Sequence, residues 1–466
     1  MTYILLLLTI LLIWAIAYPL TDYALLSPPS LILLMFAFAT LLALIGCAYW
    51  NQVSLSTEAY FIVTVGCIGV LAAAFIAKNL FRANESASVR QKAIQAIEHI
   101  ARISQKRWLG LAGFVVIAAA INIGEMVALA QNAGYVGSSF MDIAQWARGN
   151  ISSLLTSGST DGDESYSTLS SALNKLIMFC GYAAVIGLAA KIRIAERGRG
   201  ASDYAGIVLL FLVAAGFSLM KGGRDTIAHY IVAFLVALFA FYLLTSHDRN
   251  KTSLKFFKIG VVFVVVAIPL FYLALELVGR TRSVSLFDYT SFYFGGGLPS
   301  LSYALESFPT NVSEAFSGER TFTQLYAALS KIGLIGPVDA YADTFIKLDG
   351  HSSNIFTCFY RYYVDFGYVG VFLLSCLATL VFCWCFDLLT KSPSVAVKIV
   401  AVYVCSYAAD VAREEFIFSR LLSASLLWAI IASVIIGFAL TYRRQKKASV
   451  RNDRVGVGDT TEASLE

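Results

Sequence analysis

Long apolar runs alternate with short polar or charged segments along nearly the whole chain. Many runs reach about 18 residues, and a helix of that length crosses about 30 Å of hydrocarbon. The pattern therefore predicts an all-α fold, a polytopic transmembrane helical bundle with about eleven spans. We place the spans at residues 2–20, 29–50, 58–77, 108–129, 171–190, 204–220, 229–245, 258–278, 367–389, 395–409 and 421–440.

The composition agrees with a membrane protein. The 466 residues have a mean hydropathy of +0.72, and only 14% of them are charged. We expect one integral membrane domain over residues 1–440, followed by a polar cytoplasmic tail over 441–466 that is unstructured after Arg444. The net charge of +5 is modest, so no nucleic-acid partner is indicated.

The lysines and arginines predict the orientation. Loops 78–107, 191–203, 246–258 and 390–398, together with the tail from 441, hold 23 of the 35 basic residues. The opposite loops, 130–170, 221–228, 279–366 and 410–420, hold 11. The positive-inside rule makes the first set cytoplasmic, so the C-terminus is inside and loop 279–366 is external.

Two loops are expected to be partly helical. Loop 78–107 places Ile94, Ile97, Ile100 and Ala101 on one face, which is typical of an interfacial amphipathic helix. Loop 279–366 is almost 90 residues long, rich in aromatic residues, and contains the run Gly295–Gly297. Because long structureless loops are uncommon, we expect it to form a short helical cap over an external cavity.

Basic residues gather on the predicted external side. Lys221-Gly222-Gly223-Arg224-Asp225 separates two apolar runs, and Arg280 and Arg282 follow a later span. Lysine and arginine are usually depleted from the external side of a membrane, so cations there need an explanation. A guanidinium group binds two phosphate oxygens at once and stays protonated. The cluster fits a bulky anionic substrate, such as a lipid-linked pyrophosphate. The structural alternative is snorkelling, or ion pairs such as Arg224 with Asp225.

The segment before the span at 367–389 adds candidate chemistry on the same side. His351 carries the imidazole that most often acts as a general base near neutral pH, although a solvated or helix-capping histidine is the alternative. Arg361 and Asp365 have the i, i+4 spacing of a helical ion pair. Arg413 lies in the last external loop.

Several classes of chemistry lack their sequence patterns. We find no P-loop, dinucleotide-binding fingerprint, HExxH, GxSxG or CxxC metal spacing in a suitable context, so we expect no metal and no cofactor. Asp161-Gly162-Asp163-Glu164 looks like the DxD motif of metal-dependent glycosyltransferases. It lies in a Ser/Gly/Thr-rich stretch, which favours a solvated loop.

An ordered set of motifs resembles the Wzy-type O-antigen and capsule repeat-unit polymerases, which are more distantly related to O-antigen ligases. The set consists of GGRD after an apolar run, GRTR at a span end, then FDYTSFYFGGGLPSLSYALES, SGERTF and HSSNIFTCFYRYYVDFGYVG. The similarity is sharpest from Arg224 to Gly370. Relatives often have about twelve spans, and the family implies the inner membrane of a bacterium with an active site facing the periplasm.

The resemblance implies a metal-independent and nucleotide-independent glycosyl transfer. A polyprenyl-pyrophosphate-linked glycan would be the donor, and the hydroxyl of a second lipid-linked repeat unit would be the acceptor. Membrane lipid and a chain-length regulator protein are the further partners implied. The catalytic set is Arg224 and Arg280, which would hold the pyrophosphate, with His351 as the general base. The substrate-binding set is Lys221, Arg282, Tyr293, Gly296, Asn354, Arg361 and Arg413.

Two other functions stay open at this point. A flippase or transporter of lipid-linked sugars would be expected to carry ionisable residues at mid-membrane and paired repeats. An O-antigen ligase would use the same donor with a different acceptor. The FYFGGGLP and FYRYYVDFG segments favour the polymerase.

Overall fold

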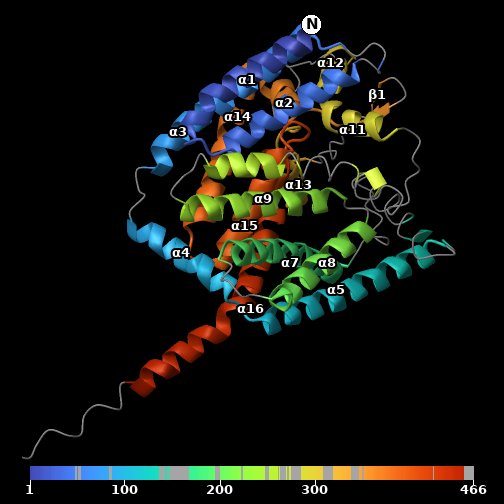
Figure 1. Ribbon diagram of the computed structural model, residues 1–466. Coiled ribbons are helices and arrows are strands. Elements are labelled where there is room, and N and C mark those ends of the chain that lie inside the picture. The colour runs from blue at the N-terminus through green and yellow to red at the C-terminus, as the bar shows by residue number, and fades with distance from the viewer. Residues whose placement is uncertain are drawn as a thin grey trace, which may run out of the picture.

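The computed structural model is a bundle of helices (Figure 1). It describes residues 1–47, 50, 54–82, 87–135, 142–143, 146, 167–194, 200–221, 224–246, 251–260, 262, 269, 272–273, 285–307, 318–336, 346–348, 351–422 and 424–455. Its longer helices are α1 Thr2–Leu20, α2 Pro28–Gly46, α3 Thr57–Arg82, α4 Ala87–Ala101, α5 Gln105–Asn132, α7 Thr168–Arg193, α8 Ala205–Met220, α9 Arg224–Thr245, α14 Cys358–Lys391, α15 Val395–Ser406 and α16 Ala424–Val455.

Eight helical segments among the described residues are long and apolar enough to cross a membrane. They coincide with eight of the spans predicted from the apolar pattern, which confirms the polytopic helical fold. Two shorter apolar helices, Val395–Ala409 and Leu426–Tyr442, overlap two more. The predicted span at 258–278 lies largely outside the described residues.

The helices pack closely around an apolar core. α3 and α14 form the most extensive contact, and a Cβ on Gly69 would lie 2.6 Å from the Phe372 carbonyl oxygen. A larger residue therefore does not fit at this crossing without a backbone shift. Phe36 of α2 stacks on Phe359 of α14 with ring centroids 4.8 Å apart, which ties α2 to the same core.

The long loop 279–366 is only partly as expected. It contains α11 Leu286–Gly295, α12 Gly297–Ser307 and α13 Thr323–Lys331, so the partly helical prediction is confirmed. It also contains an antiparallel hairpin of β1 Ile346–Leu348 and β2 His351–Ser353, which the all-helical prediction missed. β1 does alternate apolar and polar residues, but strands of three residues are too short to be recognised from the sequence.

Two helix boundaries differ from the prediction. α14 begins at Cys358 and not near residue 367, and it is kinked at Gly367, whose φ is 62° and ψ −159°. The aromatic stretch before Gly367 is thus a short helix of its own. α16 continues to Val455, so the tail that we expected to be unstructured after Arg444 is helical over its first part. Strong helix formers in that segment, such as lysine and glutamine, account for the extension.

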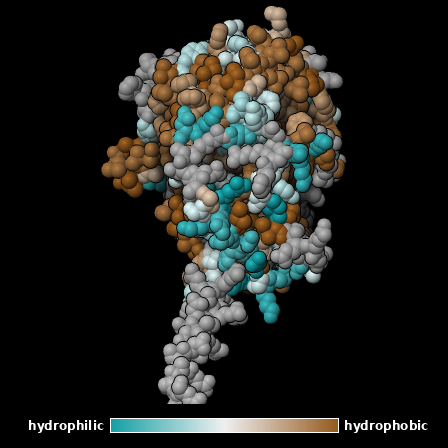
Figure 2. Space-filling model, turned by 60° about the vertical axis from the view of Figure 1, so that its left-hand side comes forward, coloured by the Kyte–Doolittle hydropathy of each residue, from teal (hydrophilic) through white to brown (hydrophobic). Residues whose placement is uncertain are grey.

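The bundle has two chemically different ends. α4 lies at one end, and α11, α12 and the hairpin lie at the other (Figure 1). α4 is amphipathic as predicted: Ile97, Ile100 and Ala101 are buried and pack against the bundle. In Figure 2 the end that carries α4 comes forward, with hydrophilic side chains gathered over it and apolar side chains around them. We call this the α4 end and the opposite one the α11 end.

Candidate functional site

A charged network occupies the α11 end of the bundle. It is built by the first turns of α9, by α11, by the short helix Cys358–Phe366, and by the segment between α15 and α16. That segment, residues 410–421, ends in the π-helical turn Ile417–Leu421. The Cys358 N–H donates to the Val411 carbonyl, which attaches the segment to the start of α14.

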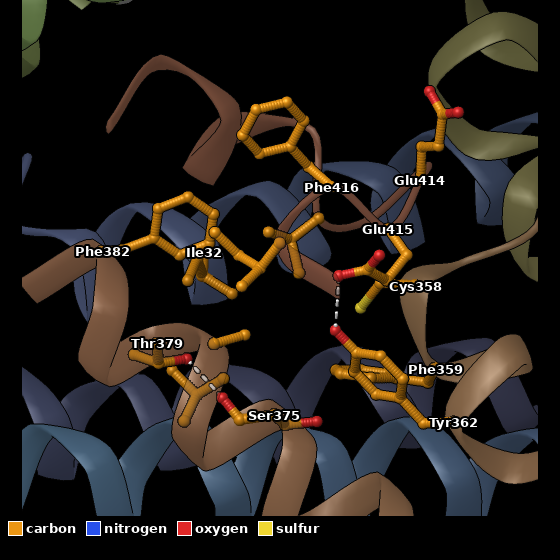
Figure 3. A pocket seen from close by; sticks show the side chains of 14 residues that line it. Ile32, Cys358, Phe359, Tyr362, Ser375, Thr379, Phe382, Glu414, Glu415 and Phe416 are labelled. Carbon is orange, nitrogen blue, oxygen red and sulfur yellow. Dashed lines mark hydrogen bonds between the residues drawn. The ribbon is translucent and has the colours of Figure 1, made fainter. Parts of the chain in front are cut away.

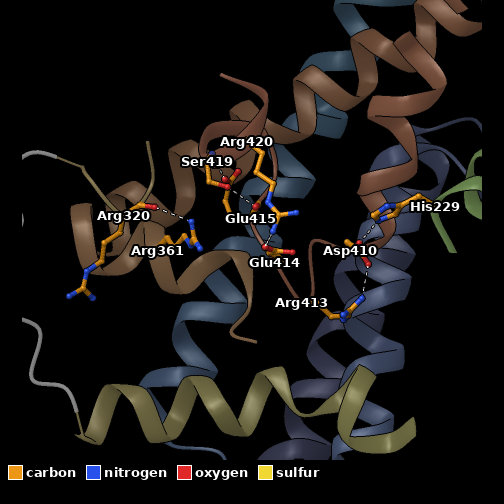
Figure 4. Close-up of polar contacts among 9 residues, drawn as sticks. All are labelled: His229, Arg320, Arg361, Asp410, Arg413, Glu414, Glu415, Ser419 and Arg420. Atoms are coloured by element: carbon orange, nitrogen blue, oxygen red, sulfur yellow. Dashed lines mark hydrogen bonds and ion pairs between the residues drawn. The ribbon is translucent and has the colours of Figure 1, made fainter. Parts of the chain in front are cut away.

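Asp410 lies at the centre of one half of the network (Figure 4). One carboxylate oxygen pairs with His229 Nε2, and the other accepts from Arg413 Nη1 at 3.2 Å. The His229 and Arg413 side chains are only 9% and 14% exposed, so both contacts are largely removed from water. Burial opposes ionisation of Asp410, but His229 and Arg413 outweigh it and hold the pKa of Asp410 well below its usual range.

Arg413 links Asp410 to α11. Its guanidinium lies over the Tyr293 ring, 4.1 Å from the centroid, and the Tyr293 hydroxyl donates to Asp225 Oδ1. A guanidinium against an aromatic face is a stabilising cation–π contact. Burial raises the pKa of Tyr293, so the phenol remains a hydrogen-bond donor at neutral pH. The chain Asp410–Arg413–Tyr293–Asp225 thus connects three elements and brings Arg413 beside α9.

The second half of the network surrounds Glu414. Its carboxylate forms an ion pair with Arg420, and Arg361 and Arg413 also favour its ionised form. Although 44% of the Glu414 side chain is exposed, its partial burial opposes ionisation and raises the pKa of Glu414 above its usual value. Figure 4 shows Glu414 between Arg420 and Arg413, with Arg361 to the left of Glu414 in this view. A carboxyl group with a raised pKa among arginines is suited to proton transfer next to an anionic ligand.

Glu415 holds the turn that carries these residues. It accepts hydrogen bonds from Phe418 N at 2.9 Å and Ser419 N at 2.6 Å, and from the Tyr362 hydroxyl at 3.0 Å. It is 2% exposed. Its carboxylate therefore fixes the geometry of the π-helical turn instead of being available to a ligand.

A small pocket lies beneath this segment (Figure 3). Apolar side chains of α2, α3 and α14 line most of it, and Glu414 and Glu415 contribute to its rim. Tyr362 and Glu415 form their hydrogen bond at one side, as Figure 3 shows. Its lining is too apolar for a diphosphate or a sugar, so the candidate site is the charged network above it.

Arg361 and Asp365 both bond to the segment that precedes α13. Arg361 Nη1 donates to the Arg320 carbonyl at 3.3 Å, and Asp365 Oδ2 accepts from Thr321 N at 2.7 Å. Arg320 in turn donates to the Tyr360 hydroxyl at 3.4 Å. The long loop is therefore attached to the first turns of α14 through backbone as well as side-chain groups.

Lys221 caps α8 at the same end. Its ammonium lies 5.6 Å from the centroid of the Phe217 ring. Burial and the nearby Lys175 lower the pKa of Lys221 to about 8, and Glu125 partly opposes them. A lysine beside a second cation and with a depressed pKa gains its full charge when an anion binds.

The described residues of the predicted set all lie at the α11 end. Arg224 is the first residue of α9, His351 begins β2, and Gly296 is the C-cap residue that follows α11. Asn354 is exposed after the hairpin. Lys221, Tyr293, Arg361 and Arg413 have the contacts given above. Arg280 and Arg282 lie outside the described residues.

Six residues of the network were not predicted from the sequence, namely Asp225, His229, Asp410, Glu414, Glu415 and Arg420. A signal was present, since residues 410–420 hold five charged side chains between two apolar runs, namely Asp410, Arg413, Glu414, Glu415 and Arg420. The pairing of His229 with Asp410 joins positions 181 residues apart, and no local pattern reveals it.

Fold and site together define a polytopic helical membrane protein with a charged and aromatic network at one end of the bundle. Comparisons of the chain with protein-family models, with curated proteins and with solved structures find no match.

Proposed function

We propose that this protein is a membrane glycosyltransferase that polymerises polyprenyl-pyrophosphate-linked repeat units into O-antigen or capsular polysaccharide. The observation that carries the proposal is the Arg413 guanidinium, held between Asp410 and the Tyr293 ring at the end where Lys221 and Arg224 also lie. This combination offers cations to a diphosphate and aromatic rings to a sugar. The site would face the periplasm of a bacterial inner membrane, as the bias of basic residues favours.

In this mechanism the chain supplies position and charge. The hydroxyl oxygen of the acceptor glycan attacks the anomeric carbon of the donor, and the bond from that carbon to the diphosphate oxygen breaks. Arg224 and Arg280 hold the diphosphate and stabilise the charge that it gains on leaving. Lys221, Arg282 and Arg413 add positive charge around it.

The proton of the acceptor hydroxyl needs a base. His351 is the base expected from the sequence, and general-base assistance contributes roughly 10²–10⁴-fold. Glu414 has the charged surroundings of a second candidate, as described above. Tyr293, Gly296, Asn354 and Arg361 would contact the glycans, with Gly296 allowing close approach of the backbone.

The arrangement favours a transferase over a flippase. A carrier of lipid-linked sugars would place ionisable groups along its path at mid-membrane, whereas this network lies at one end of the bundle. An O-antigen ligase would use the same donor chemistry, so the acceptor is the difference to be tested.

The decisive experiment uses the purified protein in lipid vesicles with a synthetic polyprenyl-pyrophosphate-linked repeat unit. A polymerase releases polyprenyl pyrophosphate in step with a ladder of lipid-linked oligomers. A ligase requires an added lipid A core acceptor, and a flippase exposes the substrate without breaking a bond. In cells, deletion should leave single repeat units attached to the surface lipid. Loss of all attached repeats would identify a ligase and contradict the proposal.

A further inference from the structure

α13 and the turn that follows it present apolar side chains to the surroundings of the bundle. The apolar residues Phe322, Leu325, Leu329 and Ile332 follow helical spacing along one stripe. The first residue of the stripe, Phe322, packs against other rings of the protein, whereas its last residue, Ile332, is largely exposed. Ile332 is 68% exposed and Leu334 is 69% exposed. None of the residues of α13 itself is buried.

α13 starts where a lipid-facing surface starts. The Phe322 ring packs edge-on against Phe366 and Phe418, which places it at the kink before Gly367. Directly beyond that kink, α14 exposes Val369 and Leu373 on the outside of the bundle, at 69% and 56%. α16, which follows the π-helical turn, exposes Leu427 at 59% in the same way. Such exposure in a membrane-spanning helix is contact with lipid.

We propose that α13 and the turn 331–336 lie in the lipid interface of the leaflet at the α11 end, as an in-plane amphipathic helix. Ile332 and Leu334 enter the boundary between headgroups and acyl chains. Gln324 and Lys331 stay on the neighbouring polar face, where a lysine reaches anionic headgroups. Lipid is the occupant because the stripe starts at Phe322, which packs on Phe366 directly before the outward-facing apolar residues of α14.

This placement goes beyond the proposed glycosyl transfer, and it holds whether or not that activity is found. An α13 anchored in the interface would hold the segment before it at a fixed depth relative to the membrane. Thr321, which bonds to Asp365, would be held at the level of the membrane surface between an anchored helix and the first turns of α14.

The test measures depth directly in the full-length protein reconstituted in nanodiscs that contain anionic phospholipid. A nitroxide is attached to Ile332→Cys and Leu334→Cys, with Gln324→Cys as the matched control on the same helix. Wild-type protein treated with the same reagent gives the background from its native cysteines. Accessibility is measured to oxygen, which concentrates in the bilayer, and to a water-soluble nickel chelate.

We expect the probes at 332 and 334 to favour oxygen over the nickel chelate several-fold more than the probe at 324 does. Equal access of the nickel chelate to all three sites would place α13 in water and overturn the inference. Low access of both reagents to 332 and 334 would show that protein covers the stripe, either a second copy or another subunit, and would overturn it equally. Neither result depends on enzymatic activity.

Discussion

The two ends of the bundle use their positive charges differently. At the α4 end, cations donate to backbone carbonyls where helices finish: Arg90 Nε to Leu244 O at 3.0 Å, and Lys391 Nζ to Phe81 O at 2.8 Å. Lys391 also pairs with Asp387 of its own helix. At the α11 end, Arg413 and Arg420 engage carboxylates, and Arg413 also covers an aromatic ring. The first arrangement satisfies the free carbonyls of helix C-termini. The second holds several charges together where no helix end requires them.

The difference separates structural cations from candidate functional ones. Lys398 shows the structural case most clearly: it is fully buried, and its ammonium donates to the Leu389 and Thr390 carbonyls. Arg413 is largely buried as well, but it contacts a carboxylate and an aromatic ring of α11 instead of helix-end carbonyls. Positive charge that is held in a network of this kind at one end of a membrane bundle is expected to bind a ligand.

The largest effect on elongation is expected from replacing His351, the proposed general base. His351→Ala should slow elongation roughly 10²–10⁴-fold while leaving donor binding unchanged, because the proton transfer is lost but the cations remain. Elongation rate and donor affinity would be measured separately with purified protein and lipid-linked repeat unit. Elongation within about threefold of wild type would place proton transfer elsewhere, and Glu414→Gln would be the next variant.

The second-largest effect is expected from Arg413→Ala. It leaves Asp410 with one partner fewer in a buried setting, and truncating one member of such a pair costs about 2–5 kcal/mol. We expect a loss in donor affinity or elongation of at least about thirtyfold. Arg90→Ala, at the opposite end, is the matched control. Equal losses in the two variants would abolish the distinction between the ends.

Arg224→Ala and Arg280→Ala should each weaken donor binding about 10- to 150-fold, which corresponds to about 1.5–3 kcal/mol for a hydrogen bond to a charged group. Lysine at either position should restore little, because the two-pronged contact of guanidinium is lost. Binding of the lipid-linked donor and the length of polymer in cells are the measurements. Normal chain-length ladders in both alanine variants would refute the pyrophosphate role.

A smaller effect is expected from pH. The pKa of Lys221 is lowered to about 8 by burial and by Lys175, so the side chain loses its charge as the pH rises through 8. KM for an anionic donor should therefore increase between pH 7 and 9.5, by up to about tenfold. Lys221→Arg should flatten this part of the profile, since guanidinium stays protonated. An unchanged rise in the arginine variant would assign the pH dependence to another group.

The smallest effect on activity is expected at the α4 end. Lys391→Met removes the hydrogen bond to Phe81 O and the ion pair with Asp387. The loss should be about 0.5–1.5 kcal/mol in stability, seen as a lower unfolding temperature in detergent. Elongation at a permissive temperature should stay near the wild-type rate. A strong loss of elongation without loss of stability would mean that the α4 end takes part in the reaction.

The apolar pattern was sufficient to predict the helical bundle, because each membrane span is determined by its own local sequence. Runs such as residues 2–20 and 58–77 satisfy their own backbone as helices, and the bilayer leaves few alternatives. The loop charges also indicated which loops share an end, since Arg90, Arg193 and Lys391 come from three loops of the basic set and lie near Leu244, Thr245 and Phe81.

The site was less predictable because it depends on contacts between distant positions. Glu415 looks like any charged loop residue until Phe418 N, Ser419 N and Tyr362 surround it. The arginines could be predicted because their charge is unusual in loops that the positive-inside rule assigns to the external side. Asp410 could not, because its role depends on a histidine in another helix. The hairpin at 346–353 is too short to leave a period in the sequence.

The bend at Gly367 bears on how the protein responds to bilayer thickness. Its backbone lies in a region open almost only to glycine, so the helix before it points in a direction of its own. A span that tilts to match a thinner or thicker membrane would rotate residues beyond 367 as a rod. The turns that carry Arg361 and Tyr362 would stay aligned with Arg320 and Glu415, to which they bond. A single glycine would thereby separate the first turns of α14 from the tilting of the rest of that span.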